Sequence, residues 1–214
     1  MALAKICGLS TGPTLDAALA GGAAFVGFVF FPASPRYVSL TTAQTLATRA
    51  RGRAGIVAVT VDPDDDLVDS LMAELRPDFL QLHGHESPER VREIARRSGA
   101  GIIKAIPVLS QADLNIAAAY DDQVDHLMFD AKASATAPRP GGLGEAFDWS
   151  ILAGARFRRP WFLAAGLNPT NVVAAVATSG APMVDVSSGV ESAPGLKEPA
   201  LITRFLAAID RSAA

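Results

Sequence analysis

One cysteine occurs in the 214 residues, at the end of the apolar run LAKIC (residues 3–7) and directly before a glycine. The reactive form of a cysteine is the thiolate, and an ordinary thiol titrates at about pH 8.5, so a thiolate at neutral pH needs a positive charge nearby. Lys5 lies two residues before Cys7, which places both side chains on the same face of a β-strand. We expect Lys5 to favour the Cys7 thiolate, although a single cysteine in an apolar strand is more often a small core residue.

Other reactive side chains also follow apolar runs. Arg36 lies in the proline-rich loop FPASPRYVS, His83 ends the run FLQLH, and Asp130 ends the run HLMFD. Arginine can bind a carboxylate through two parallel hydrogen bonds, and apolar neighbours disfavour the charged form of a carboxyl group, so that it keeps its proton. Each residue also has a structural interpretation: a surface charge for Arg36, a hydrogen-bonded loop residue for His83 and a salt bridge for Asp130.

Two further stretches could bind a phosphate group. Gly166 follows the run WFLAA (161–165), and Ser187, Ser188 and Gly189 lie at the end of the run MVDVSS (183–188). Neither AAGLNP nor DVSSGV contains Lys or Arg, so a phosphate would have to be held by main-chain N–H groups and serine hydroxyls. The alternative is that the serines only cap a helix.

Eight short runs rich in Val, Ile, Leu, Phe and Ala recur along the chain, and most are nearly continuous rather than alternating with polar residues. This pattern is typical of parallel strands that are covered on both faces. The runs are residues 3–7, 25–30, 55–61, 79–83, 101–106, 126–130, 161–165 and 183–188. Residue types that start helices lie between them, at residues 14–16, 41–42, 64–66, 87–88 and 169–170.

Eight strand–helix units in a chain of this length predict an α/β fold with a single (β/α)8 TIM barrel domain over residues 1–214; a doubly wound open sheet is the alternative. In such a barrel the carboxyl ends of all strands open onto one face, where the reactive residues would meet. The acidic sequence DPDDD (62–66) is interpreted as a helix start rather than a metal site. Residues 132–146 are rich in Ala, Pro and Gly, which predicts a mobile flap or, alternatively, a plain surface insertion.

The composition narrows the class of partner. The net charge of −3 offers no basic stripe for nucleic acid, and the longest apolar run, residues 23–31, is far shorter than the ~20 residues of a membrane-spanning helix. A single cysteine cannot form an internal disulfide, and Lys5 interrupts the start of the chain too early for an ordinary signal-peptide core. We therefore expect a cytoplasmic protein that binds a small molecule rather than nucleic acid or a membrane.

Several motifs together resemble phosphoribosylanthranilate isomerase, an enzyme family of tryptophan biosynthesis. They are KICGLS, GFVFFPASPRYVS, QLHG, FDAK followed by GGLGEAFDW, AAGLNPTNV and DVSSGVESAPGLK, which stand in the family's order over nearly the whole chain. The resemblance implies a (β/α)8 barrel and an Amadori rearrangement of N-(5-phosphoribosyl)anthranilate to the aminodeoxyribulose phosphate. It implies no metal and no cofactor.

The resemblance also implies roles for the candidate residues. Cys7 corresponds to the family's general base, Asp130 to its general acid, and Arg36 to an arginine near the anthranilate carboxylate. We further expect His83 to contact the substrate. The expected phosphate-binding residues are Gly166, Ser187, Ser188 and Gly189. Both a monomer and a homodimer are compatible with the sequence.

Three other functions stay open at this point. A phosphoribosyl isomerase of histidine biosynthesis performs the same rearrangement on another amine, but that family uses two aspartates, whereas the first strand here ends in Cys7. Indole-glycerol-phosphate synthase would need Lys and Glu at strand ends, and Lys104 lies inside its run. A non-catalytic sugar-phosphate-binding barrel would have a phosphate site without the acid and base pair.

Overall fold

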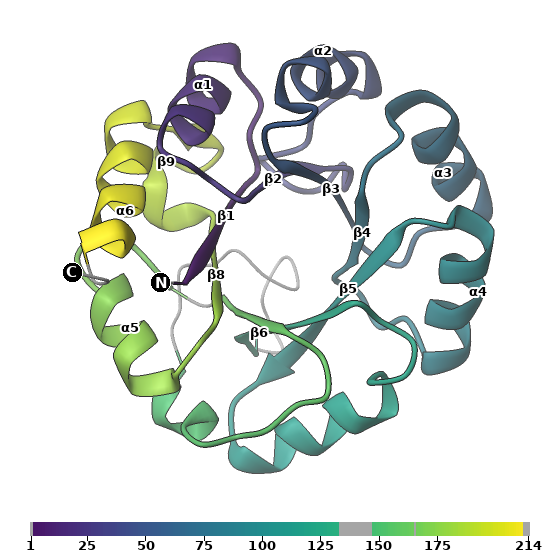
Figure 1. The fold of residues 1–214 in the computed structure, drawn as a ribbon. Helices are drawn as coiled ribbons and strands as arrows, with labels where there is room; N and C mark the ends of the chain where they lie inside the picture. Colours follow the sequence, from purple (N-terminus) through teal and green to yellow (C-terminus); the bar gives the residue numbers. More distant parts are fainter. Residues whose placement is uncertain (1, 133–146, 165, 212–214) are drawn as a thin grey trace.

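Eight parallel strands close into a barrel in chain order, and β8 pairs with β1 (Figure 1). The computed structural model describes residues 2–132, 147–164 and 166–211. The strands are β1 (Leu3–Cys7), β2 (Phe25–Val29), β3 (Gly55–Thr60), β4 (Phe79–Leu82), β5 (Gly101–Val108), β6 (His126–Ala131), β7 (Trp161–Leu163) and β8 (Met183–Val186). Each begins at the first residue of a predicted run, so the predicted barrel is confirmed and the open sheet is excluded.

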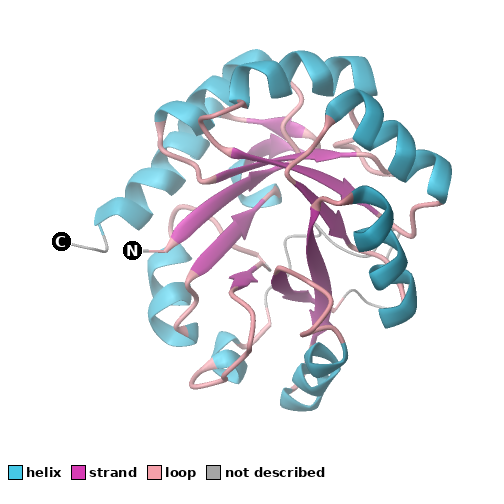
Figure 2. Ribbon diagram, turned by 45° about the vertical axis from the view of Figure 1, so that its right-hand side comes forward, coloured by secondary structure: helices cyan, strands magenta, loops and turns pink. Residues whose placement is uncertain are grey.

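Helices form a ring around the barrel (Figures 1 and 2). They are α1 (Gly12–Ala20), α2 (Leu40–Ala50), α3 (Asp65–Ser70), α4 (Pro88–Ser98), α5 (Val172–Ser179) and α6 (Pro199–Arg211). A π-helical turn η1 (Leu71–Leu75) extends α3, and 3-10 segments form η2 (Gln111–Ala119), η3 (Trp149–Leu152) and η4 (Ser188–Val190). Helix α6 packs against α1 and lies beside β1, which completes the ring.

Polar side chains start three of these helices by accepting a hydrogen bond from the main-chain N–H three residues later. They are Ser39 before α2, Asp64 before α3 and Ser87 before α4. Asp64 confirms the interpretation of the acidic sequence as a helix start. Helix α2 begins slightly earlier than predicted, because Ser39 rather than a threonine provides the cap. The predicted flap falls on residues 132–146, of which all but Lys132 lie outside the described residues.

Side chains that point inward from the strands fill the barrel. The apolar ones form one cluster of Cys7, Val29, Val57, Val59, Ile103, Ala105, Met128, Phe162, Ala164 and Met183. A second, larger cluster lies on the outside of the strands and includes residues of the helices. Strand alternation therefore directs Lys5 and Cys7 together into the barrel, as the sequence predicts, and Lys5 is completely buried.

Four rings pack against one another at the end of the barrel where the strands begin. Phe25, Phe79, His126 and Phe162 pack with neighbouring ring centroids 5.3 to 6.0 Å apart. Burial lowers the pKa of His126, while the charge of Asp125 opposes the shift. The Nδ1 atom of His126 is buried without a hydrogen-bond partner in the described part of the chain, so the folded protein favours the neutral ring.

This burial predicts a pH-dependent loss of stability. The unfolded chain binds a proton at His126 at an ordinary pKa of about 6.5, whereas the folded chain binds it only at lower pH. The stabilisation is complete above the unfolded pKa and is lost as the pH falls through the window between the two values. Urea unfolding at several pH values should show a smaller loss between pH 7.5 and 5.5 in His126→Phe than in the wild-type protein. Equal losses in the two proteins would contradict this assignment.

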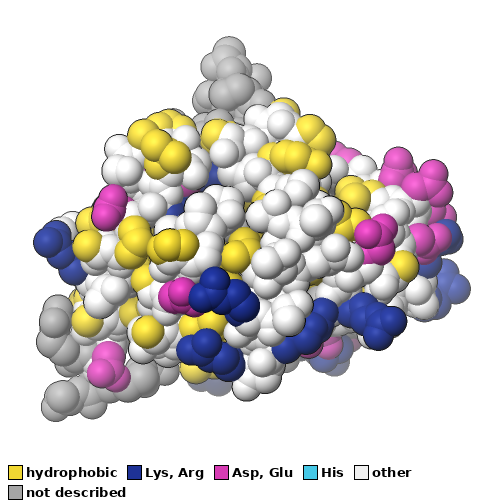
Figure 3. Space-filling view, turned by 90° about the horizontal axis from the view of Figure 1, so that it is seen from above, with side chains coloured by type: hydrophobic (Ala, Val, Ile, Leu, Met, Phe, Trp, Pro, Cys, Tyr) yellow, Lys and Arg dark blue, Asp and Glu magenta, His cyan; other side chains and the backbone are white. Residues whose placement is uncertain are grey.

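Charged side chains of both signs lie beside one another on the outer surface. Figure 3 shows acidic and basic groups close together toward the right-hand edge of the face that it draws. Among the surface ion pairs are Arg49 with Asp16 and Arg97 with Asp69. Within the described ranges no helix combines the length and apolar character that crossing a bilayer requires.

Candidate active site

The carboxyl ends of the strands bring the predicted reactive residues to one face of the barrel. Cys7 ends β1, His83 follows β4, Asp130 lies near the end of β6, and Ser187 follows β8. Cys7 and Asp130 retain only 6% and 9% of their exposure, respectively. These residues come from strands spread around the barrel, so they surround its mouth rather than occupy one side of it.

Cys7 lies beside a buried ion pair. Lys5 Nζ is 2.8 Å from Asp185 Oδ1, and both side chains point into the barrel. A methyl group built on Gly27 would lie 3.2 Å from both Cys7 Sγ and Lys5 Nζ, so the thiol and the ammonium group lie over the same glycine. Burial lowers the pKa of Lys5, but the charges of Asp185 and Cys7 outweigh it and leave the pKa raised. Lys5 therefore stays protonated.

The predicted effect of Lys5 on Cys7 is correct in sign but is not the largest effect. Burial raises the pKa of the Cys7 thiol, the positive charge of Lys5 lowers it, and the negative charge of Asp185 raises it again. The net direction is upward. In the protein without substrate, burial therefore outweighs the favourable effect of Lys5, because the site that brings Lys5 close to the thiol also excludes the water that would stabilise the thiolate.

Asp130 contacts His83 across the mouth of the barrel. Asp130 Oδ2 lies 3.3 Å from His83 Nε2, and Oδ1 accepts a hydrogen bond of 2.8 Å from the N–H of Ala131. On its other side, His83 Nδ1 lies 3.1 Å from Nε2 of Gln81 in β4. His83 thus joins the predicted acid to a buried amide.

Arg36 reaches the same face, but its guanidinium already has a partner. Nε and Nη2 donate to the two carboxylate oxygens of Glu191 at 2.7 and 2.8 Å, and the structure gives Nη1 no partner among the described residues. The stem of Arg36 crosses Gly8, where an added Cβ would lie 2.8 Å from Arg36 Cδ and where φ is +78°. Glycine at position 8 therefore lets the stem of Arg36 lie against the main chain directly after Cys7.

A two-stranded antiparallel hairpin after β8 supplies the partner of Arg36. Its strands are β9 (Glu191–Ala193) and β10 (Leu196–Lys197). The ammonium group of Lys197 donates to Glu191 and, at 3.2 Å, to the hydroxyl of Ser187. Burial lowers the pKa of Lys197, whereas the paired cations outweigh burial for Glu191 and lower its pKa.

The charges around Cys7 do not balance. Lys5, Arg36 and Lys197 are positive, and Asp185 and Glu191 are negative, so this group carries one excess positive charge while the thiol is neutral. One negative charge would neutralise this group. Either the Cys7 thiolate or an anionic group of a ligand can provide it.

The expected phosphate-binding residues lie on adjoining loops, and some already have structural roles. The hydroxyl of Ser187 donates to the carbonyl of Cys7 at 3.3 Å. A Cβ at Gly189 would lie 1.8 Å from the carbonyl oxygen of Leu167, so glycine here allows the loops after β7 and β8 to touch. Gly166, in the β7 loop, adopts a left-handed φ of +66°. Ser188 begins η4.

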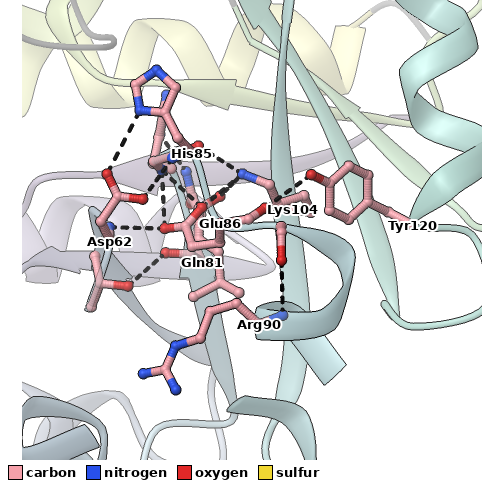
Figure 4. Close-up of polar contacts among 12 residues, drawn as sticks. Asp62, Gln81, His85, Glu86, Arg90, Lys104 and Tyr120 are labelled. Carbon is pink, nitrogen blue, oxygen red and sulfur yellow. Dashed lines mark hydrogen bonds and ion pairs between the residues drawn. The ribbon is translucent and has the colours of Figure 1, made fainter. Parts of the chain in front are cut away.

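The loop after β4 is fixed by a buried ion pair (Figure 4). Glu86 Oε2 lies 2.8 Å from Lys104 Nζ, and these side chains are 1% and 3% exposed. Glu86 also accepts hydrogen bonds from the N–H groups of Asp62 and Gly84, and Lys104 donates to the carbonyl of Gly84. The hydrogen-bond partners of Glu86 and Lys104 lie on this loop or next to it, so the ion pair fixes the position of the segment that carries His83.

The sequence of nearly the whole chain matches a family of isomerases. A family model described as N-(5'phosphoribosyl)anthranilate (PRA) isomerase matches residues 4–208. The N-(5'-phosphoribosyl)anthranilate isomerase of Caulobacter sp. (strain K31) is 59% identical over 212 residues, which cover 99% of this chain and 100% of the relative. The chain belongs to the N-(5'-phosphoribosyl)anthranilate isomerase family.

Solved structures of this isomerase family have the same fold. The phosphoribosyl anthranilate isomerase of Thermotoga maritima is 32% identical, with a TM-score of 0.87, over 99% of this chain and 100% of that one. A further structure of the isomerase, in complex with reduced 1-(o-carboxyphenylamino)-1-deoxyribulose 5-phosphate, has a TM-score of 0.85 at 32% identity and the same coverage. Another Thermotoga maritima structure is of monomers generated from the dimeric enzyme.

Sequence reasoning missed several residues of this isomerase's site. Asp185 and Gln81 are polar residues inside apolar strand runs, and such residues need buried partners, so their positions alone gave a signal. Glu191 and Lys197 lie in a short hairpin that has no comparable signal. The distant partners, Lys5 for Asp185 and Arg36 for Glu191, come into contact only in the folded barrel.

The Lys5 effect on the isomerase thiol can be measured by alkylation. Cys7 should react with iodoacetamide with a pH midpoint above that of a free thiol, and Lys5→Met should raise the midpoint further, because it removes the cation and leaves Asp185 uncompensated. The double variant Lys5→Met/Asp185→Asn should fall between the two. Coincident midpoints in the wild-type protein and Lys5→Met would exclude an effect of Lys5 on the thiol.

Proposed function

We propose that this chain catalyses the isomerisation of N-(5'-phosphoribosyl)anthranilate in tryptophan biosynthesis, with Cys7 as general base and Asp130 as general acid. The observation that carries the proposal is the arrangement at the carboxyl ends of the strands, where the Cys7 thiol near Lys5 and Lys197 and the Asp130 carboxyl group beside His83 lie on the same face of the barrel. The rearrangement needs one acid and one base on different sides of the sugar.

The acid acts first. Asp130 donates a proton to the furanose ring oxygen while the bond between that oxygen and the anomeric carbon breaks, and the anthranilate nitrogen supplies the electron pair that forms the Schiff base. The open chain keeps its phosphate and its carboxylate, which hold it in place during the second proton transfer.

The base then removes the proton from the neighbouring sugar carbon. The Cys7 thiolate takes this proton, and the electron pair of the C–H bond moves toward the Schiff base nitrogen to give the enolamine, which tautomerises to the ketose. Burial opposes the thiolate, but Lys5 and Lys197 lower the pKa of Cys7, and a positively charged Schiff base adds to their effect. Thiolate formation is thus coupled to the state of the substrate.

Arg36 and the two loops would bind the ends of the substrate. With Nε and Nη2 held by Glu191, Nη1 is the remaining guanidinium nitrogen for the anthranilate carboxylate. The phosphate would lie on the loops that carry Gly166, Ser188 and Gly189, with Ser187 oriented toward Cys7 and Lys197. His83, which contacts Asp130, would also contact the substrate. No metal or cofactor takes part in these steps.

Turnover by the purified protein tests this proposal directly. Incubation with N-(5'-phosphoribosyl)anthranilate should give the ketose phosphate, measured by chromatography, and the amine substrate of the histidine-type isomerase should not react. Binding of the first substrate without turnover would instead favour a non-catalytic sugar-phosphate-binding barrel. Turnover of the second substrate alone would favour the histidine-type enzyme.

Arg36→Lys should bind the substrate nearly as poorly as Arg36→Ala. An ammonium group has no planar fork, so it cannot pair with Glu191 along one edge and with the substrate carboxylate along the other. We expect KM to rise about tenfold or more in both variants, the scale of a lost charged hydrogen bond. Steady-state kinetics checks this, and a wild-type KM in Arg36→Lys would contradict the bidentate role of Arg36.

Three broader predictions complete the proposal. The partner is a small molecule, the protein works in the cytoplasm, and residues 1–214 form one domain. Both a monomer and a homodimer remain compatible with the chain, and sedimentation of the purified protein distinguishes them.

A further inference from the structure

Gln81 is a buried amide inside the barrel with one atom left unpaired. It lies in β4 and is 1% exposed. Its Nε2 lies 3.1 Å from His83 Nδ1 and 3.3 Å from Met128 Sδ, whereas its Oε1 is buried and has no hydrogen-bond partner in the described part of the chain. An unpaired buried acceptor destabilises a protein, and an apolar side chain of similar length would avoid the cost. The amide therefore requires an explanation other than packing.

The contacts of Gln81 set the tautomer of His83. Because Nε2 of an amide can only donate, His83 Nδ1 accepts, and the proton of the neutral ring is on Nε2. That proton points at Asp130 Oδ2, 3.3 Å away, while Oδ1 accepts from Ala131. With this tautomer, Asp130 receives two hydrogen bonds, an arrangement that stabilises its carboxylate form.

The proton-loaded state needs the opposite orientation of the amide. A protonated His83 carries hydrogen on both ring nitrogens, so Nδ1–H would face the amide donor. Rotation of the amide by half a turn brings Oε1 to Nδ1–H and gives the unpaired oxygen a partner. Gln81 can therefore pair with His83 in both protonation states without any movement of the strand.

We propose that Gln81 is a positioning residue whose amide turns with the protonation of His83, so that His83 and Asp130 together hold the proton that Asp130 delivers. This rests on the proposed function, in which Asp130 is the acid. The Nε2 proton of His83 passes to Asp130 Oδ2, and Asp130 donates a proton to the ring oxygen as the ring C–O bond breaks. A carboxylate and a neutral His83 with hydrogen on Nδ1, bonded to Oε1, remain.

The other charged groups near this histidine are engaged elsewhere. From β5, Lys104 pairs with Glu86, and from the loops after β3 and β4, Asp62 pairs with the exposed His85 (Figure 4). Strand β3 contributes an uncharged contact, from His83 N to the carbonyl of Thr60. Among the charged groups of the described residues, Asp130 is the one that contacts the His83 ring.

Two substitutions of Gln81 by side chains of similar size should shift the midpoint of His83 protonation in opposite directions. Gln81→Met removes the acceptor for Nδ1–H, whereas Gln81→Glu provides an acceptor only. NMR of the full chain with ¹⁵N-labelled histidine, without substrate, should show hydrogen on Nε2 in the neutral wild-type ring, with His83→Asn used for assignment. We expect the midpoint of His83 protonation to fall in Gln81→Met and to rise in Gln81→Glu, each by about one pH unit, the scale of one buried hydrogen bond.

Kinetics provides the second readout. The alkaline limb of the kcat profile with N-(5'-phosphoribosyl)anthranilate should move in the same two directions, with KM changed less than about twofold, because Gln81 acts through His83. Met128→Leu, which removes the other neighbour of Nε2, is the matched control and should leave both midpoints in place. Circular dichroism confirms that each variant is folded.

Shifts of the same sign in Gln81→Met and Gln81→Glu, or no shift, would overturn the proposal, as would hydrogen on Nδ1 in the neutral wild-type ring. Absence of turnover in the wild-type protein would instead overturn the proposed function. The NMR midpoints, which need no substrate, would then still decide whether Gln81 controls the protonation of His83.

Discussion

Cys7→Ala is expected to lower kcat at least about a hundredfold, the scale of a lost positioned base, with little effect on the fold. The thiol is the group at the end of β1 that can accept a proton from carbon, and it lies over Gly27 beside Lys5. Alanine fills most of the same volume but offers no basic atom. Cys7→Ser should be similarly slow, since a hydroxyl ionises far less readily than a thiol.

Val57→Ala provides the matched control for this loss. Val57 also points into the barrel and is fully buried, so its truncation removes interior volume without touching the proposed acid or base. We expect it to lower the thermal midpoint while kcat stays within a few fold. Wild-type kcat in Cys7→Ala, with an unchanged circular dichroism spectrum, would remove Cys7 from the mechanism.

Asp130→Asn should cause a loss of similar size, at least about a hundredfold in kcat. The amide has the shape of the carboxyl group, and its single oxygen can still accept from the N–H of Ala131, so one of the two contacts that orient residue 130 can persist. It cannot deliver an acidic proton to the ring oxygen. KM should therefore change much less than kcat.

A carboxylate at the opposite end of β6 provides the matched control for Asp130→Asn. Asp125, directly before β6, accepts a hydrogen bond of 2.7 Å from the N–H of Ile102 at the end of the barrel where the strands begin. Asp125→Asn should reduce stability and leave kcat nearly unchanged. If Asp125→Asn and Asp130→Asn lost kcat to the same extent, the effect would be one of carboxylate removal in general, and Asp130 would not be the specific acid.

The sequence was sufficient for the eight strands and favoured the closed barrel over an open sheet, because strands and their regular alternation with helices depend on local patterns. Nearly continuous apolar runs indicate strands covered on both faces, and the regular repeat of strand and helix leaves few ways to connect them. Strand alternation also placed Lys5 and Cys7 on one inward face. For the same reason the positions of His83 and Asp130 at strand ends on the reactive face followed from the sequence.

Local patterns were less informative where the chain departs from regular α-helix. The segment between β5 and β6 forms the 3-10 element η2 rather than an ordinary α-helix. The hairpin of β9 and β10 follows β8 within a few residues and has no apolar run. Both elements are short, and the contacts that stabilise them come mainly from the surrounding structure.

The tertiary structure decided which charges meet and which effect on Cys7 is larger. Lys5 and Asp185 are 180 residues apart, and Arg36 and Glu191 are 155 apart; they meet because closure of the barrel sets β8 beside β1. The sequence alone determined that a lysine stands next to the thiol. Whether its charge outweighs burial depends on the water that the folded barrel excludes, and this dependence is why only the tertiary structure gave the upward direction of the Cys7 pKa.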